Sequence, residues 1–178
     1  ISNGTETSHF RASFGASDNK GVFPNEKLSR INIDLNAGTE LNKWMSIDGK
    51  ISLSRTKAED RPEYGTYGAI NQLMGIPHNV RLDDLKQYST EDAVHVNWYG
   101  PSAEIRNPYY VLHQRHNSDE RWRAFGYYST KINFTDWLHL SAKYAFDYYR
   151  TRVQNTNAGD AYNNETVPSA ITDDKMDR

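Results

Sequence analysis

The sequence predicts an all-β protein, an antiparallel up-and-down meander of about five long strands from a large transmembrane β-barrel. The first observation is strict alternation in two pairs of segments that meet at very short turns, near Trp44 and Trp137. A period of two places alternate side chains on opposite faces of a sheet. The second observation is that one face is apolar and aromatic, whereas the other is polar and charged. The third is that short turns gather at one end of the sheet and long loops at the other.

The first three strands are expected at residues 8–16, 30–39 and 45–55. A turn-rich loop separates the first two, and the tight turn at residues 40–44 joins the second to the third. The apolar positions of these strands, in chain order, are Phe10, Ala12, Phe14, Ala16, Ile31, Ile33, Leu35, Ala37, Met45, Ile47, Gly49, Ile51 and Leu53. These segments exceed the usual globular strand length of about five or six residues.

Residues 56–119 show no sustained alternation and are expected to form a long loop. Loops of this length are uncommon in compact domains and are usually functional. Two short helices are expected inside it, at residues 83–88 and 107–114. The second has the better start, because Asn107 can cap a helix and Pro108 suits its first position.

The last two strands are expected at residues 121–134 and 138–152, joined by the short turn at residues 135–137. Residues 153–178 are rich in Asn, Asp, Thr and Ala, which indicates another long loop. The chain is therefore interpreted as one partial barrel domain over residues 1–178. The short turns would mark the periplasmic rim, and residues 56–119 would lie outside.

Charged residues deep inside the strands distinguish two interpretations of the apolar face. They fall on the polar face at Asp34, Asp48, Lys50, Arg123, Lys131, Lys143 and Asp147. In a membrane barrel the apolar face meets lipid and the polar face lines a wet lumen. In a soluble sheet the apolar face packs on a core. The charges, and the aromatic residues near the strand ends, favour the barrel, and a soluble β-domain stays open as the alternative.

The composition of the chain argues against several other classes of protein and site. The net charge of −2 argues against a general nucleic-acid binder. The absence of cysteine excludes a disulfide framework and a thiolate metal site. No run of about 20 apolar residues is present, so no transmembrane helix is expected. The chain starts at Ile1 and ends in a polar segment, and we expect it to be a piece of a longer chain.

Four segments, in order, resemble the SusC/RagA-type TonB-dependent outer-membrane transporters of Bacteroidota. The segments are residues 8–15 with 18–25, residues 41–47, residues 75–85, and residues 107–110 followed by Asn117, Asp119, Arg121 and Arg123. The resemblance spans almost the whole chain but covers only the start of the family's barrel. Transporters of this kind close about 22 strands around a plug. Because unpaired strand edges are not tolerated in lipid, the chain would be stable only with the rest of the barrel.

The resemblance implies energised import of an oligosaccharide or oligopeptide cargo across the bacterial outer membrane. A SusD-like surface lipoprotein would cover the barrel as a lid, and TonB would act through parts outside this chain. This chain would contribute barrel wall in contact with outer-membrane lipid, lumen lining and outer loops. The alternative function is that of a soluble or surface-attached β-domain that binds glycans.

We expect no enzyme and no cofactor, because no Ser/His/Asp order, glycine-rich phosphate loop or buried carboxylate pair stands out. His113 and His116 are three residues apart, but no acidic residue follows at the spacing of a zinc protease. The pairs of aspartates at residues 83–84 and 173–174 do not fit an EF-hand. Metal binding is therefore not expected.

Candidate ligand contacts lie in the long loop. They are Tyr64, Tyr67, Arg81, Trp98, Tyr99 and Tyr109. Aromatic faces can stack on sugar rings, and the arginine can donate hydrogen bonds to hydroxyl groups. The competing interpretation is that these aromatic side chains pack the loop on itself or against a lid protein, since large ordered loops need small cores of their own.

Overall fold

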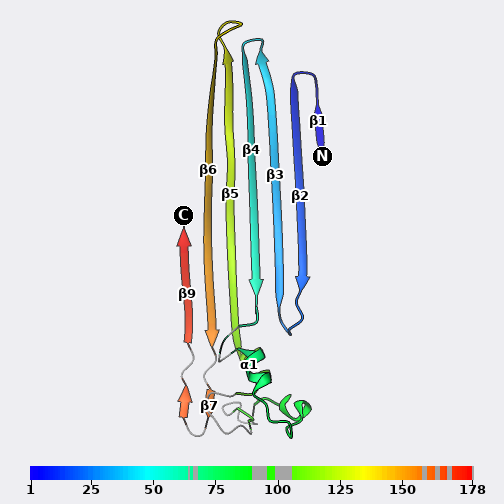
Figure 1. Ribbon diagram of the computed structural model, residues 1–178, viewed down its shortest axis with the longest axis vertical. Coiled ribbons are helices and arrows are strands. Elements are labelled where there is room, and N and C mark those ends of the chain that lie inside the picture. Colours follow the sequence, from blue (N-terminus) through cyan, green and yellow to red (C-terminus); the bar gives the residue numbers. More distant parts are fainter. Residues whose placement is uncertain are drawn as a thin grey trace.

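A computed structural model describes residues 1–63, 65, 68–89, 96–98, 106–157, 160–162, 165–167 and 170–177. One large antiparallel sheet runs through it in the order β1-β2-β3-β4-β5-β6-β9 (Figure 1). The strands are β1 (Ser2–Gly4), β2 (Ser8–Lys20), β3 (Lys27–Asn42), β4 (Met45–Glu59), β5 (Arg115–Asn133), β6 (His139–Asn157) and β9 (Ala170–Asp177). Each strand pairs with its neighbour in the chain, apart from a small hairpin of β7 (Asp160–Tyr162) and β8 (Glu165–Val167) between β6 and β9. The predicted all-β meander is confirmed.

The predicted strand limits were wrong. All five strands are longer in the structure than predicted, so residues 56–59 and 115–119 of the expected long loop belong to β4 and β5. Strands β1 and β9 add two further strands to the sheet. The interpretation of residues 153–178 as a long loop fails, because β6 continues to Asn157 and β9 pairs with it. Near this end of the sheet both faces carry polar side chains. The period of two therefore leaves little hydropathy signal, although the chain is extended.

Short turns close one end of the sheet (Figure 1). Between β3 and β4, the Trp44 backbone N–H donates to Asn42 Oδ1 at 3.0 Å. Between β5 and β6, the Leu138 N–H donates to Thr135 Oγ1 at 3.0 Å, and the Phe134 N–H to the Leu138 carbonyl at 2.9 Å. The connection between β2 and β3 and the helices lie at the opposite end. The predicted sorting of connections by length is thus present.

Three short helices lie in the segment between β4 and β5: α1 (Ala69–Met74), the 3-10 helix η1 (Leu82–Leu85) and α2 (Pro108–Gln114). Helix α2 begins as predicted, since Asn107 Oδ1 accepts from the Tyr109 N–H at 2.9 Å. Helix η1 is shorter than the predicted 83–88. Helix α1 was not predicted, because Gly68 provides no side-chain cap and its first turn has no acidic residue. No described helix is long and apolar enough to cross a membrane.

The apolar side chains of the sheet are largely exposed. Phe14 is 72% exposed, Tyr144 69% and Leu140 54%. Among the described residues, the buried hydrophobic side chains are Ala58, Ala69, Leu85, Tyr110 and Val111, and only Ala58 belongs to the sheet. The described hydrophobic core therefore lies mainly among the helices, and the apolar face of the sheet is uncovered.

Candidate functional site

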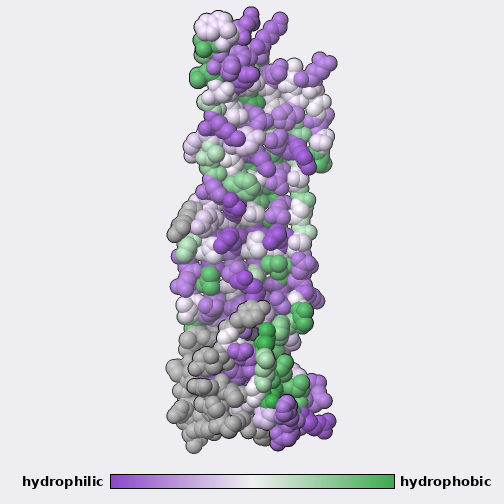
Figure 2. Space-filling view, viewed as in Figure 1, coloured by the Kyte–Doolittle hydropathy of each residue, from purple (hydrophilic) through white to green (hydrophobic). Residues whose placement is uncertain are grey.

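The strand register places the predicted charged residues together on one face of the sheet. We call this surface the polar face. Its members on β2 to β6 include His9, Arg11, Arg30, Asp34, Glu40, Asp48, Lys50, Arg121, Arg123, Phe125, Tyr127, Lys131, Lys143, Asp147 and Tyr149. The space-filling view shows a face on which hydrophilic side chains predominate along most of the strand length (Figure 2). The polar face is a continuous surface across several strands.

Two acid–base contacts order the polar face. Arg123 Nε donates to Asp147 Oδ1 at 2.9 Å, and Arg123 Nη2 donates to the second carboxylate oxygen. His9 Nε2 lies 3.1 Å from Asp48 Oδ2. Gly38 leaves the space for this second contact, because a Cβ there would lie 2.3 Å from His9 Cε1.

Three aromatic side chains on the polar face were not identified from the sequence. Phe125, Tyr127 and Tyr149 each lie beneath a cation. Lys143 Nζ is 4.1 Å from the Tyr127 ring centroid, Arg123 Cζ is 4.8 Å from that of Phe125, and Arg121 Cζ is 5.7 Å from that of Tyr149. All three have odd residue numbers, as Arg123 and Lys143 have. The alternation of the strands could therefore have placed them on the polar face.

The opposite face, which we call the apolar face, changes character along the strands. We call a row of residues paired across adjacent strands a rung. The apolar rungs of this face run from the pair Met45–Ile132 to the pair Arg55–Trp122. Arg55 Cζ lies 5.2 Å from the Trp122 ring centroid, and Arg55 Nε donates to Glu120 Oε1 at 2.6 Å. This hydrogen bond lowers the pKa of Glu120. The apolar band therefore ends in charged side chains toward the helix-bearing end.

Farther along this charged region, β6 and β9 are joined by ion pairs. Arg152 Nε donates to Asp173 Oδ1 at 2.9 Å, and Arg150 Nε lies 3.3 Å from Asp177 Oδ1. The hydrogen bond from Arg152 lowers the pKa of Asp173. Sequence reasoning missed these pairs because it assigned residues 153–178 to a loop.

Of the predicted ligand contacts, Tyr64, Tyr67 and Tyr99 lie outside the described residues. Arg81 is exposed immediately before η1, whereas Trp98 and Tyr109 are partly buried. The structure links the backbone near Trp98 and Tyr109 but does not show Arg81 in the same network. A role for these side chains in ligand contact stays a prediction.

Asn107 organises the loop around these residues. Its side chain is fully buried and donates to the carbonyl oxygens of Leu85 and Asn97, both at 2.9 Å. It also accepts from the Tyr109 N–H. Tyr88 completes this cluster, with an edge-on contact to Tyr110 and a stacked contact to His113. The described part of the loop thus has a small core of its own.

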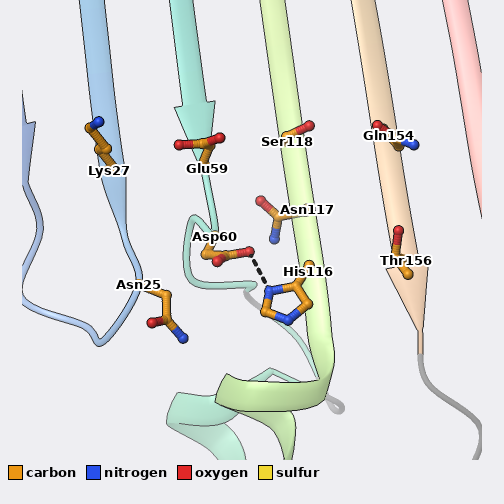
Figure 3. A pocket seen from close by; sticks show the side chains of 9 residues that line it. All are labelled: Asn25, Lys27, Glu59, Asp60, His116, Asn117, Ser118, Gln154 and Thr156. Carbon is orange, nitrogen blue, oxygen red and sulfur yellow. Dashed lines mark hydrogen bonds and ion pairs between the residues drawn. The ribbon is translucent and has the colours of Figure 1, made fainter.

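A polar pocket lies at the helix-bearing end of the sheet (Figure 3). Its lining residues are Asn25, Lys27, Glu59, Asp60, His116, Asn117, Ser118, Gln154 and Thr156. His116 Nδ1 lies 3.0 Å from Asp60 Oδ1. Asn117 holds the chain beside it, because its side chain accepts from the Arg61 N–H at 3.0 Å and donates to the Arg61 carbonyl at 2.8 Å.

This pocket does not assemble a recognisable catalytic or metal site from the described residues. The hydrogen bond of the His116 ring joins it to Asp60, and no hydroxyl group of the described residues forms one with it. His113 stacks on Tyr88 and does not join His116. No group of three or more His, Cys, Asp or Glu side chains within the described ranges could hold a metal ion.

No protein-family model matches the chain, and no curated protein is significantly similar to it in sequence.

Proposed function

We propose that the protein forms a sector of the wall of a transmembrane β-barrel in the bacterial outer membrane. The observation that carries the proposal is the exposure of the apolar face. Large apolar side chains on this face are exposed, such as Phe14 at 72% and Tyr144 at 69%. Among the described helices, the one with several contacts to the sheet is α2, which leads directly into β5. Lipid is a suitable solvent for such a surface.

The height of the apolar band supports this proposal. The band begins at the rung of Met45 and ends at Arg55, ten positions later in the chain. At about 3.4 Å per residue, this interval spans about 34 Å along the strand. A strand tilt of about 40° reduces this to about 26 Å along the membrane normal, close to the roughly 25 Å apolar band of outer-membrane barrels.

Aromatic side chains lie near both limits of the band. Trp44 and Trp137, at the short turns, are 52% and 80% exposed. Trp122, at the opposite limit, is 52% exposed. Aromatic girdles at the two membrane interfaces are typical of outer-membrane barrels. In this orientation the turn end faces the periplasm and the helix-bearing end faces the outside.

Within such a wall, the polar face lines a lumen, and β1 and β9 pair with further strands. We propose that the complete barrel is a TonB-dependent importer of the SusC/RagA type. Its cargo is an oligosaccharide or oligopeptide, and its partners are TonB and a SusD-like surface lipoprotein. Support comes from the four sequence segments described above and from the long, helix-bearing connection on the proposed outer side.

A deletion strain tests the import function. We expect loss of growth on an oligosaccharide or peptide source that requires the importer, and unchanged growth on its monomers. Restoring the full-length gene should restore growth, whereas a version unable to engage TonB should not. Fractionation provides the location, and the protein should leave the outer membrane only with detergent. A detergent-free, monomeric natural protein would contradict the proposal and favour a soluble β-domain that binds glycans.

A further inference from the structure

The polar face has a surplus of positive charge at the heights where the opposite face is apolar. Between the rungs of Ser46 and Thr56 it holds seven Lys and Arg side chains and four Asp and Glu side chains. The four acids are Asp34, Glu40, Asp48 and Asp147. The chain as a whole has a formal net charge of −2. The charge of this face is therefore opposite in sign to that of the chain.

Six of these seven cations have no carboxylate partner among the described residues. Arg123 is the exception, through its contact with Asp147. The six are Arg11, Arg30, Lys50, Arg121, Lys131 and Lys143. Arg30 and Arg121 both pair with Thr56 in the register, so no acidic side chain lies between them. Most of these cations are therefore not held in ion pairs within the described sheet, and the face has three more positive than negative side chains.

Aromatic rings hold several of these cations in place without neutralising them. Lys50 lies opposite Tyr127 in the register, and Lys143 Nζ is 4.1 Å from the same ring centroid. Lys50 Nζ is also 5.9 Å from the Phe125 ring centroid. A cation–π contact is attractive but leaves the full charge on the ammonium group. Lys50 and Lys143 therefore remain available to an anionic ligand.

We propose that the polar face binds an acidic oligosaccharide, whose sugar units carry carboxylate or sulfate groups. This inference rests on the proposed function, because cargo reaches this face only if the face lines a lumen. Rings of Lys and Arg side chains are the usual lining of anion-selective pores. Hydroxyl and amide groups such as those of Asn36, Ser54 and Thr56 lie between the cations and can hydrogen-bond to sugar hydroxyl groups.

The probe pair is an oligogalacturonate and its fully methyl-esterified form, which share a backbone and differ in charge. Titration uses the purified full-length protein in detergent, after fractionation has established that it is a membrane protein. The acid should bind at least about tenfold more tightly than the ester. One charge-assisted hydrogen bond is enough to produce a difference in affinity of this size. Its affinity should fall with salt, because the Debye length shrinks from about 10 Å at 0.1 M to about 3 Å at 1 M.

Variants test whether the acidic probe binds at the polar face. Lys50→Gln and Lys143→Gln should each weaken binding of the acid about tenfold. Lys50→Arg retains the charge and should bind the acid within about threefold of the wild type. Arg150→Gln, on the opposite face, should leave the affinity unchanged.

Three results would overturn the inference while leaving the import proposal intact. They are equal affinity for acid and ester, binding of neither probe by a protein that still imports its cargo, and preference for an oligoglutamate peptide over the oligogalacturonate. Loss of affinity in the Arg150→Gln variant equal to that in Lys143→Gln would also overturn it, because the effect would then not belong to the polar face. Failure of fractionation or growth restoration would instead reject the import proposal itself.

Discussion

An arginine at the middle of the apolar band gives a sharp test of what the band contacts. Leu35 lies in the rung of Ile51, Gly126 and Phe146. Ile51 lies four positions from the charged limit at Arg55, which is about 14 Å along the strand and about 10 Å in depth at a tilt of about 40°. The opposite limit of the band is about 16 Å away in depth. Leu35→Arg would therefore place a guanidinium group near the bilayer midplane.

The expected cost follows from this depth. Arg or Lys on the lipid face destabilises a barrel by about 2–4 kcal/mol at the midplane and by about 0–1 kcal/mol near the interfaces. Leu35→Arg should therefore lower the free energy of unfolding by about 3 kcal/mol. Ile31→Arg, in the rung of Arg55 and Trp122, should lower it by less than about 1 kcal/mol. Asn32→Arg lies on the polar face, opposite the uncharged Gly15 and Ser54, and should change it by no more than about 0.5 kcal/mol.

The assay is reversible denaturant unfolding of the full-length protein in lipid vesicles, with the folded fraction read from its gel mobility. The three variants lie on one strand and introduce the same side chain at two depths of the apolar face and on the polar face. Equal costs for the three variants would contradict contact between the apolar band and lipid. So would a neutral Leu35→Arg, which is the result expected for an exposed side chain in water.

Three further predictions concern the loop, the sheet and the charged region. Asn107→Ala should remove the amide donor to the carbonyl oxygens of Leu85 and Asn97. The loop should become more sensitive to proteolysis, and hydrogen exchange of the Tyr109 N–H should become faster. The gel mobility of the barrel should stay unchanged. Gly126→Ala should lower the free energy of unfolding by about 1–3 kcal/mol, because its Cβ would lie 2.2 Å from a carbonyl oxygen of the adjacent strand. Gly15→Ala is the matched control, with no atom nearer than 4.0 Å, and equal effects of the two would contradict the prediction. Because the hydrogen bond from Arg55 lowers the pKa of Glu120 in the folded state, Glu120 should contribute stability above its ordinary pKa and lose it as the pH falls through the lowered pKa. A Glu120→Gln variant should lack this small pH dependence in denaturant titrations, and an unchanged dependence would exclude the pair with Arg55 as its source.

The middle of the sheet was predictable from sequence because its two faces differ in polarity. Ile31, Ile33 and Leu35 alternate with polar residues, and the structure places them in β3. The ends of the strands were not predictable in the same way. Arg152 and Asp173 pair across β6 and β9, but neighbouring residues on both faces are polar, so that hydropathy carries no period there.

The helices show a similar dependence on local signals. Helix α2 has a capping side chain in Asn107 and a proline at its first position, and it was predicted with nearly its observed limits. Helix α1 follows Gly68 without a side-chain cap and was missed. Its location depends on contacts with distant parts of the loop, such as the hydrogen bond between Gln72 and the Arg106 N–H.

The candidate site was predicted in part. Alternation assigned Lys50, Arg123 and Lys143 to one face, and the register confirms that they share it. The aromatic partners Phe125 and Tyr127 were missed because aromatic side chains were expected on the apolar face. Pair contacts between strands depend on register, which hydropathy alone does not specify to the residue.

The central claim is that lipid covers the apolar face and water covers the polar face. Because this chain contains no cysteine, single cysteines can be introduced at positions 31–37 of β3 in a full-length protein free of other reactive thiols, and spin-labelled in lipid vesicles. We expect collision with oxygen to peak at the odd positions and collision with a water-soluble nickel complex to peak at the even positions, with a period of two in both. Equal nickel accessibility at odd and even positions, or protection of the odd positions from both reagents, would contradict it.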